Sequence, residues 1–188
     1  MRIGVLGGTF DPIHNGHLRL AIEAKEQLSL DKILFVPAYI PPHKLNYNDK
    51  KNSKIRLQLI KKTLVPFSKL DVIDYEIKKK GISYTIDTVM YLKQKFGKNQ
   101  KYFFLLGSDW TGKLNTWKDI DLLKKEITFV MVKRDSAKET DNSFLTIDFP
   151  IMEISSSLIR AKLKKNQNIR GLVPDKIVTV VQKIYSLT

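Results

Sequence analysis

The sequence predicts an α/β fold in which helices cover both faces of a doubly wound parallel sheet. Short apolar runs alternate with amphipathic helical segments along the chain, which is typical of strand-helix-strand units. The apolar runs are nearly continuous, as expected for strands that are buried on both faces. The 188 residues contain no internal repeat and no low-complexity linker, so we expect a single domain spanning 1–188.

The elements follow in a regular order. The run RIGVLGG (2–8) predicts a strand that ends in glycines, and the apolar stripe of 16–28 predicts the helix after it. Two prolines and many polar residues predict a loop at 39–52, and 134–150 has no regular pattern. The remaining strands are expected at 32–38, about 70–77, 101–107, 127–133 and 151–154, and the remaining helices at about 53–65, 85–96, 117–125, 155–165 and 173–188.

The segments that follow strands are the candidate binding loops. In an open parallel sheet, ligands bind outside the carboxyl ends of the strands, where the strand order reverses. The segments expected there are GGTFDPIHN, PAYIPPHK, GSDW and ISSS. This placement brings all three histidines of the chain, His14, His17 and His43, to one rim of the sheet.

The composition limits the classes of partner. The formal net charge is +14, but only six of the 33 basic residues are arginine, which favours a solvated lysine-rich surface over base recognition. We therefore expect small-molecule partners and no nucleic acid. The chain has no cysteine, no apolar run of membrane-span length and no signal-peptide pattern, so we expect a cytoplasmic protein without membrane contact. Whether it forms a homo-oligomer is left open.

The stretch GGTFDPIHNGHL (7–18) indicates an anion site. Gly7 and Gly8 would allow close backbone approach and unusual dihedral angles. The following helix would direct its free N–H groups at the rim, with His14 and His17 beside them as donors to phosphate oxygens. Turn or capping histidines are one alternative. Metal ligation is another, but no third His or Cys stands at ligand spacing.

The stretch ISSSLIR (154–160) indicates a second contribution to the same site. Ser155 or Ser156 can cap a helix, and the N–H groups of 156 and 157 can hold phosphate oxygens, with Arg160 on the same face. The alternative is an ordinary N-cap followed by a surface arginine.

These two stretches resemble the two signatures of the nucleotidylyltransferase superfamily, GG-T-F-D-P-x-H-x-G-H and I-S-S-[ST]-x-[IV]-[RK]. Four further stretches resemble the bacterial nicotinate mononucleotide adenylyltransferases: FVPAYIPPHK, SYTIDT, LLGSDW followed by Trp117, and GLVPDKIV. The resemblance implies the nucleotidylyltransferase type of Rossmann-like fold. It also implies transfer of AMP from ATP to nicotinate mononucleotide, which forms nicotinic acid adenine dinucleotide and pyrophosphate in NAD biosynthesis.

The resemblance also implies residue roles. The catalytic set would be His14, His17, Lys44 and Arg160. The ATP site would add Gly8, Thr9, Phe10, Gly107, Asp109, Ile154, Ser156 and Ser157, and the C-terminal helical part from about 155 would complete it. The acceptor site would comprise Gly8, Thr9, Lys44, Thr85, Asp109, Trp117 and Arg134, with the nicotinate ring against the Trp117 indole. Mg²⁺ would be bound through the ATP phosphates and by no metal site of the protein.

Several alternatives remain open at this stage. Trp117 can pack in the core, Thr85 and Asp109 can be helix caps, and Tyr84 and Trp110 are interpreted as packing residues. The chain reads VKRDS where the family has Arg-Pro-Gly, so a contact of Arg134 with substrate phosphate is left open.

Two alternative functions also remain. One is pantetheine-phosphate adenylyltransferase, which usually has Thr at the position of His14 and lacks SYTIDT and Trp117. The other is a non-catalytic nucleotide- or nucleic-acid-binding protein on the same scaffold.

Overall fold

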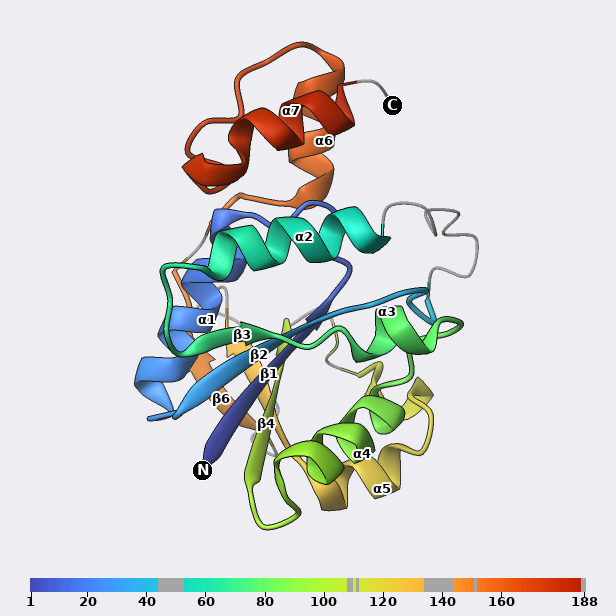
Figure 1. The fold of residues 1–188 in the computed structure, drawn as a ribbon. Coiled ribbons are helices and arrows are strands. Elements are labelled where there is room, and N and C mark those ends of the chain that lie inside the picture. The colour runs from blue at the N-terminus through green and yellow to red at the C-terminus, as the bar shows by residue number, and fades with distance from the viewer. Residues whose placement is uncertain (44–52, 108–109, 111, 134–143, 151, 187–188) are drawn as a thin grey trace.

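The computed structural model describes residues 1–43, 53–107, 110, 112–133, 144–150 and 152–186. Within this part of the chain, six strands form one parallel sheet in the order β3-β2-β1-β4-β5-β6 (Figure 1). The order reverses between β1 and β4, so the predicted doubly wound parallel sheet is confirmed. None of the helices in the described residues is long and apolar enough to span a bilayer.

The bounds of most elements lie within a few residues of those predicted. The strands are β1 (Arg2–Gly8), β2 (Lys32–Pro37), β3 (Leu70–Val72), β4 (Lys101–Gly107), β5 (Thr128–Lys133) and β6 (Leu145–Asp148). The α-helices are α1 (Asn15–Gln27), α2 (Ser53–Leu64), α3 (Tyr75–Lys79), α4 (Thr85–Phe96), α5 (Ile120–Glu126), α6 (Ser156–Lys164) and α7 (Val178–Tyr185). Two 3₁₀ turns, η3 (Leu114–Thr116) and η4 (Asp175–Ile177), precede α5 and α7.

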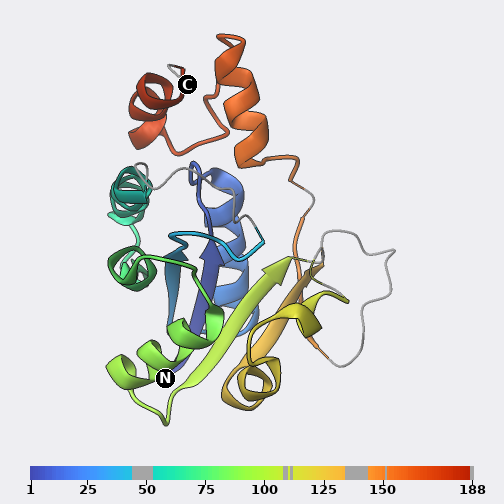
Figure 2. The ribbon, with the colours of Figure 1, turned by 90° about the vertical axis from the view of Figure 1, so that its right-hand side faces the viewer.

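Successive residues of each strand pack against opposite faces of the sheet. Phe103 and Leu105 belong to the core that includes residues of α1, α2, α6 and α7, which we call the α1/α2 core. Phe104 and Leu106 belong to the core that includes residues of α4 and α5, which we call the α4/α5 core. Burial on both faces explains why the strands read as continuous apolar runs. Figure 2 shows α6 and α7 lying together beyond one end of the sheet.

Two predicted strands are wrong. The run predicted as a strand over 70–77 pairs with β2 only through Leu70–Val72, after which the chain leaves the sheet and forms α3. An i,i+4 ion pair between Asp74 and Lys78 supports this short helix. The last strand is Leu145–Asp148, not 151–154, because it pairs with β5 up to Lys133, where β5 ends.

The glycines after β1 serve close packing and not unusual dihedral angles. A Cβ atom on Gly7 would lie 3.0 Å from the ring of Phe104, and one on Gly8 would lie 3.1 Å from the ring of Phe10. The left-handed dihedral angle falls instead on Phe10, with φ 51°. The positive φ predicted for the glycines therefore lies on Phe10, whereas close approach of a ligand to the backbone of Gly7 and Gly8 stays a prediction.

A buried arginine joins the loops that follow β1 and β2. Arg56, on α2, is fully buried and donates to the carbonyl oxygen of Thr9 at 2.5 Å and to that of Ala38 at 2.7 Å. It occupies the apolar stripe of its helix, where a hydrophobic residue is expected. Its guanidinium satisfies two carbonyl groups that the sheet does not pair.

Replacement of Arg56 should therefore destabilise the protein. We expect Arg56→Met to lower the free energy of unfolding by about 2–5 kcal/mol, because two carbonyl groups lose charged donors. Urea unfolding measures this change. Lys61→Met, an exposed position on the same helix, is the matched control and should shift it by less than about 0.5 kcal/mol. Equal effects of the two substitutions would contradict the linking role of Arg56.

Candidate active site

A cavity of about 790 Å³ lies at the carboxyl ends of β1 and β4, where the strand order reverses. This volume falls in the upper part of the range for small-molecule sites, about 300–1,000 Å³. Its wall includes Gly8 at the end of β1 and Gly107 at the end of β4. This is where doubly wound sheets bind their ligands. All three histidines line the cavity, as predicted from their common place at this rim of the sheet.

The two histidines of the first loop form a stacked pair at the start of α1. Their ring centroids lie 3.6 Å apart with an interplanar angle of 25°. His14 is nearly buried and His17 is partly exposed. Phe10 packs against His17 in an edge contact, with ring centroids 4.8 Å apart.

One hydrogen bond determines the tautomer of His17. Its Nδ1 accepts from the backbone N–H of His14 at 3.2 Å. A neutral imidazole that accepts at Nδ1 carries its proton on Nε2. Nε2 is therefore the hydrogen-bond donor of this side chain, which is the role that a phosphate oxygen requires.

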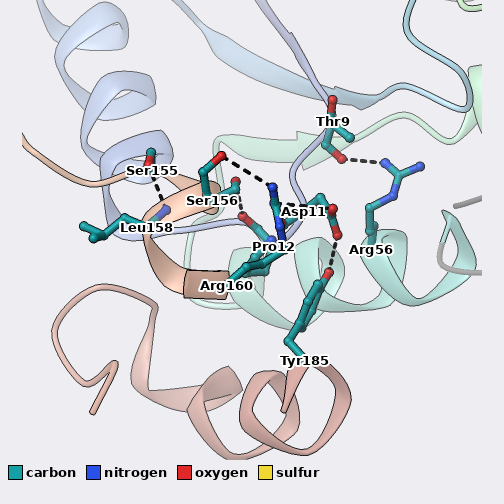
Figure 3. Close-up of polar contacts among 10 residues, drawn as sticks. Thr9, Asp11, Pro12, Arg56, Ser155, Ser156, Leu158, Arg160 and Tyr185 are labelled. Atoms are coloured by element: carbon teal, nitrogen blue, oxygen red, sulfur yellow. Dashed lines mark hydrogen bonds and ion pairs between the residues drawn. The ribbon is translucent and has the colours of Figure 1, made fainter. Parts of the chain in front are cut away.

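The C-terminal helices are fixed to the loop between β1 and α1 (Figure 3). Asp11 is the centre of this contact: its Oδ1 accepts from the Tyr185 hydroxyl at 2.6 Å. Its backbone oxygen accepts from Arg160 Nη1 at 2.5 Å, and its Oδ2 lies 3.4 Å from the same nitrogen. The Ser156 hydroxyl donates to the carbonyl oxygen of Pro12 at 2.9 Å. These bonds place the start of α6 next to the start of α1.

Ser155 is the N-cap of α6. Its hydroxyl accepts from the backbone N–H of Leu158 at 3.1 Å, which satisfies one of the N–H groups at the start of the helix. Ser155 also lines the cavity, together with Ile154. The start of α6 thus forms part of the cavity wall.

Aromatic side chains form the opposite end of the cavity. Trp117 makes edge contacts with Phe104, Phe129 and Trp110, at centroid distances of 5.8, 6.0 and 5.2 Å. It lines the cavity as well, so the alternatives of core packing and ligand contact are both compatible with its position. Trp117 precedes α5 and does not belong to it, because the helix begins at Ile120 and not at 117 as predicted.

A carboxyl group also lines this aromatic end. Glu76, on α3, is 9% exposed. Burial raises its pKa from the ordinary 4.5 to about 7, although hydrogen bonds from Thr88 and Ser83 and the charge of Lys79 act in the opposite direction. The hydroxyl of Thr88 donates to Glu76 Oε1 at 2.5 Å.

The residues predicted for the site fall into three groups. Those that line the cavity are Gly8, Thr9, His14, His17, Thr85, Gly107, Trp117 and Ile154. Those that are described but are not part of its wall are Phe10, Ser156, Ser157 and Arg160. Lys44, Asp109 and Arg134 lie outside the described residues.

Some wall residues were not assigned to the site from the sequence. Tyr84 and Trp110, interpreted as packing residues, line the cavity as well as packing against the α4/α5 core. His43 contacts Trp110, with centroids 5.2 Å apart, and completes this side. Glu76 was hidden in a predicted strand. Because Ile73, Tyr75 and Ile77 continue the apolar pattern around it, no local signal set Glu76 apart.

The described residues contain no group of three or more His, Cys, Asp or Glu side chains arranged to hold a metal ion. Acidic ligands in particular are scarce around the histidine pair, where Asp11 already bonds Tyr185 and Arg160.

Comparison with known proteins gives a consistent assignment. Residues 5–162 match the model of the family described as cytidylyltransferase-like. A Bacillus subtilis (strain 168) protein named nicotinate-nucleotide adenylyltransferase is 40% identical over 185 residues, which cover 97% of this chain and 96% of that protein. A Clostridium novyi (strain NT) protein named "Probable nicotinate-nucleotide adenylyltransferase" is 37% identical over 196 residues, 96% of each chain.

The fold has solved counterparts as well. The structure of Plasmodium falciparum nicotinic acid mononucleotide adenylyltransferase complexed with NaAD covers 100% of this chain and 98% of its own, with a TM-score of 0.73 and 22% identity. At this identity, the likeness supports the fold alone. The full-length match to curated relatives at 37–40% identity is what assigns the family. The chain therefore belongs to the cytidylyltransferase-like family and, within it, to the nicotinate-nucleotide adenylyltransferases.

Proposed function

We propose that this protein transfers AMP from ATP to nicotinate mononucleotide, forming nicotinic acid adenine dinucleotide and pyrophosphate. The observation that carries the proposal is the composition of the cavity at the sheet reversal. A stacked histidine pair and the start of α6 form one end, and a group of aromatic side chains forms the other. One end suits a polyphosphate, and the other suits a planar ring.

The reaction requires positioning more than proton transfer. The phosphate of nicotinate mononucleotide is an anionic nucleophile, so its attack on the α-phosphorus of ATP needs no general base. A bond forms between a phosphate oxygen and the α-phosphorus while the bond to the bridging oxygen breaks, and pyrophosphate leaves. The protein must hold two anions in line and stabilise the charge that develops on the leaving group.

The histidine pair is suited to the α-phosphate. His17 donates through Nε2, and the ring of His14 lies against it at the start of α1. The free N–H groups at a helix start add partial positive charge. Lys44 completes the catalytic set in our proposal, and its position lies outside the described residues.

Arg160 and the serines of α6 are proposed for the β- and γ-phosphates. The bonds of Arg160 to Asp11 hold its side chain against the loop between β1 and α1. Both bonds to Asp11 use Nη1, so the remaining N–H groups of the guanidinium are proposed to donate to the nucleotide. In this way the C-terminal helical part from about 155 would complete the ATP site.

Mg²⁺ is proposed to enter with ATP, bound to the phosphate oxygens and not to a site of the protein. Its charge would lower the cost of pyrophosphate departure. Asp109, Arg134 and the backbone of Phe10 remain proposed ligand contacts. A cytoplasmic location also remains a prediction from the sequence.

A panel of acceptors tests the function directly. We expect pyrophosphate release from ATP with nicotinate mononucleotide, and a lower kcat/KM with nicotinamide mononucleotide. Faster release with 4′-phosphopantetheine would favour the pantetheine-phosphate alternative. No release with any acceptor, together with salt-sensitive binding to DNA, would favour a non-catalytic binding protein. Equal kcat/KM values for the acid and the amide would contradict the preference for the acid.

His17→Ala should reduce kcat/KM by about 100- to 1,000-fold, because it removes one donor to charge that develops in the transition state. Steady-state pyrophosphate release measures the effect, and circular dichroism checks the fold. Arg19→Ala is the control, since Arg19 is exposed on the same helix and forms an i,i+4 ion pair with Glu23. Turnover of His17→Ala within about twofold of wild type would remove this histidine from the mechanism.

Trp117→Ala should raise KM for nicotinate mononucleotide about 5- to 150-fold, the equivalent of about 1–3 kcal/mol of stacking, and change KM for ATP far less. Tyr91→Ala is the matched control. Tyr91 packs against the same α4/α5 core and stacks on Tyr75 but does not line the cavity. If both Michaelis constants rise equally in Trp117→Ala, Trp117 acts only as a core residue.

A further inference from the structure

We infer that Glu76 is a positioning residue for the acceptor end of the cavity: its carboxyl group fixes the start of α4 and, through it, the paired wall segments 39–43 and 83–85, and so sets the affinity for the acceptor nucleotide. The inference rests on the proposed function, because it presupposes that the acceptor occupies the aromatic end. It concerns a residue to which the sequence attached no role.

Glu76 is the meeting point of the hydrogen bonds behind this wall. It accepts from the hydroxyl of Thr88, in the first turns of α4. The Ser83 hydroxyl, in the segment before α4, favours the charged form of the same carboxyl group and so lowers its pKa. Ser83 Oγ also accepts from the backbone N–H of Tyr39 at 2.9 Å. Ser83 thus joins the segment 39–43 to the start of α4, and the bond from Thr88 joins that start of α4 to Glu76.

The two segments are paired along their backbones as well. The N–H of Ser83 donates to the carbonyl oxygen of Ile40 at 2.9 Å, and Ile40 and Ile82 form an isolated parallel bridge. Pro41, Pro42 and His43 on one side, and Tyr84 and Thr85 on the other, line the cavity. A shift between the segments would therefore change the shape of the acceptor end directly.

The burial of Glu76 shows that it does not serve stability. Its charged form is disfavoured by burial, as the raised pKa of about 7 indicates. Since a carboxyl group in the unfolded chain ionises near its ordinary pKa of 4.5, this residue makes the folded state less stable as pH rises from about 4.5 to 7. At pH 8 the protein bears the whole of that cost.

Glu76→Gln tests the inference. The amide is neutral and presents N–H donors in place of one carboxylate oxygen, so the charge-assisted bond from Thr88 is weakened and an acceptor beside Ser83 is lost. We expect KM for nicotinate mononucleotide to rise about five- to tenfold, with kcat and KM for ATP within about twofold of wild type. We also expect the Tm of the variant at pH 8 to be no lower than that of wild type. Glu26→Gln, the same change at an exposed position of α1, is the control.

Thr88→Val provides a second variant that leaves Glu76 in place. Thr88 is buried, does not line the cavity and bonds the same carboxyl group. We expect the acceptor KM of Thr88→Val to rise about threefold. In the double variant with Glu76→Gln, the rise in acceptor KM should be smaller than the product of the two single effects, because both substitutions disturb one network.

The outcomes are distinct. An acceptor KM in Glu76→Gln within twofold of wild type overturns the inference, as does an equal rise of both Michaelis constants. A rise in acceptor KM that is accompanied by a lower Tm at pH 8 would assign Glu76 a structural role instead. If wild type shows no release of pyrophosphate that depends on nicotinate mononucleotide, it is the proposed function that fails.

Discussion

The reversal of strand order between β1 and β4 is the constraint on which the site depends. After β1 the chain enters α1, which packs in the α1/α2 core, whereas after β4 the next α-helix, α5, packs in the α4/α5 core. The two connections leave neighbouring strands in opposite directions, so neither covers the space between their carboxyl ends. The cavity is the direct result of this divergence, and every other feature of the site is arranged around it.

Each core supports one end of the cavity. The histidine pair is backed by Phe10, which belongs to the α1/α2 core, and the C-terminal helices of that core are bonded to the loop that carries the pair. The aromatic end is backed by Phe104 and Phe129 of the α4/α5 core. The histidine pair and the aromatic group are thus supported by different layers of the fold.

The sheet, most helices and the position of the site follow from local sequence, because apolar periodicity and loops after strands report on local burial. The wrong strands at 70–77 and 151–154 have a different cause: whether β3 extends past Val72, and which segment pairs with β5, depends on a neighbouring strand that no local pattern specifies. The buried positions of Arg56 and Glu76 could not be predicted for the same reason. A charged residue at a buried position is explained only by distant partners, such as the carbonyl oxygens of Thr9 and Ala38.

The carboxylate of Asp11 contacts both C-terminal helices, and this affects the free-energy cost of moving Arg160. Oδ1 bonds the phenol of Tyr185 and Oδ2 faces the guanidinium, so a departing arginine leaves the carboxylate with a donor still in place. The free-energy cost of leaving the buried Asp11 carboxylate without its arginine is therefore smaller. Through Tyr185, the last helix thereby contributes to the electrostatic balance of the loop that precedes α1.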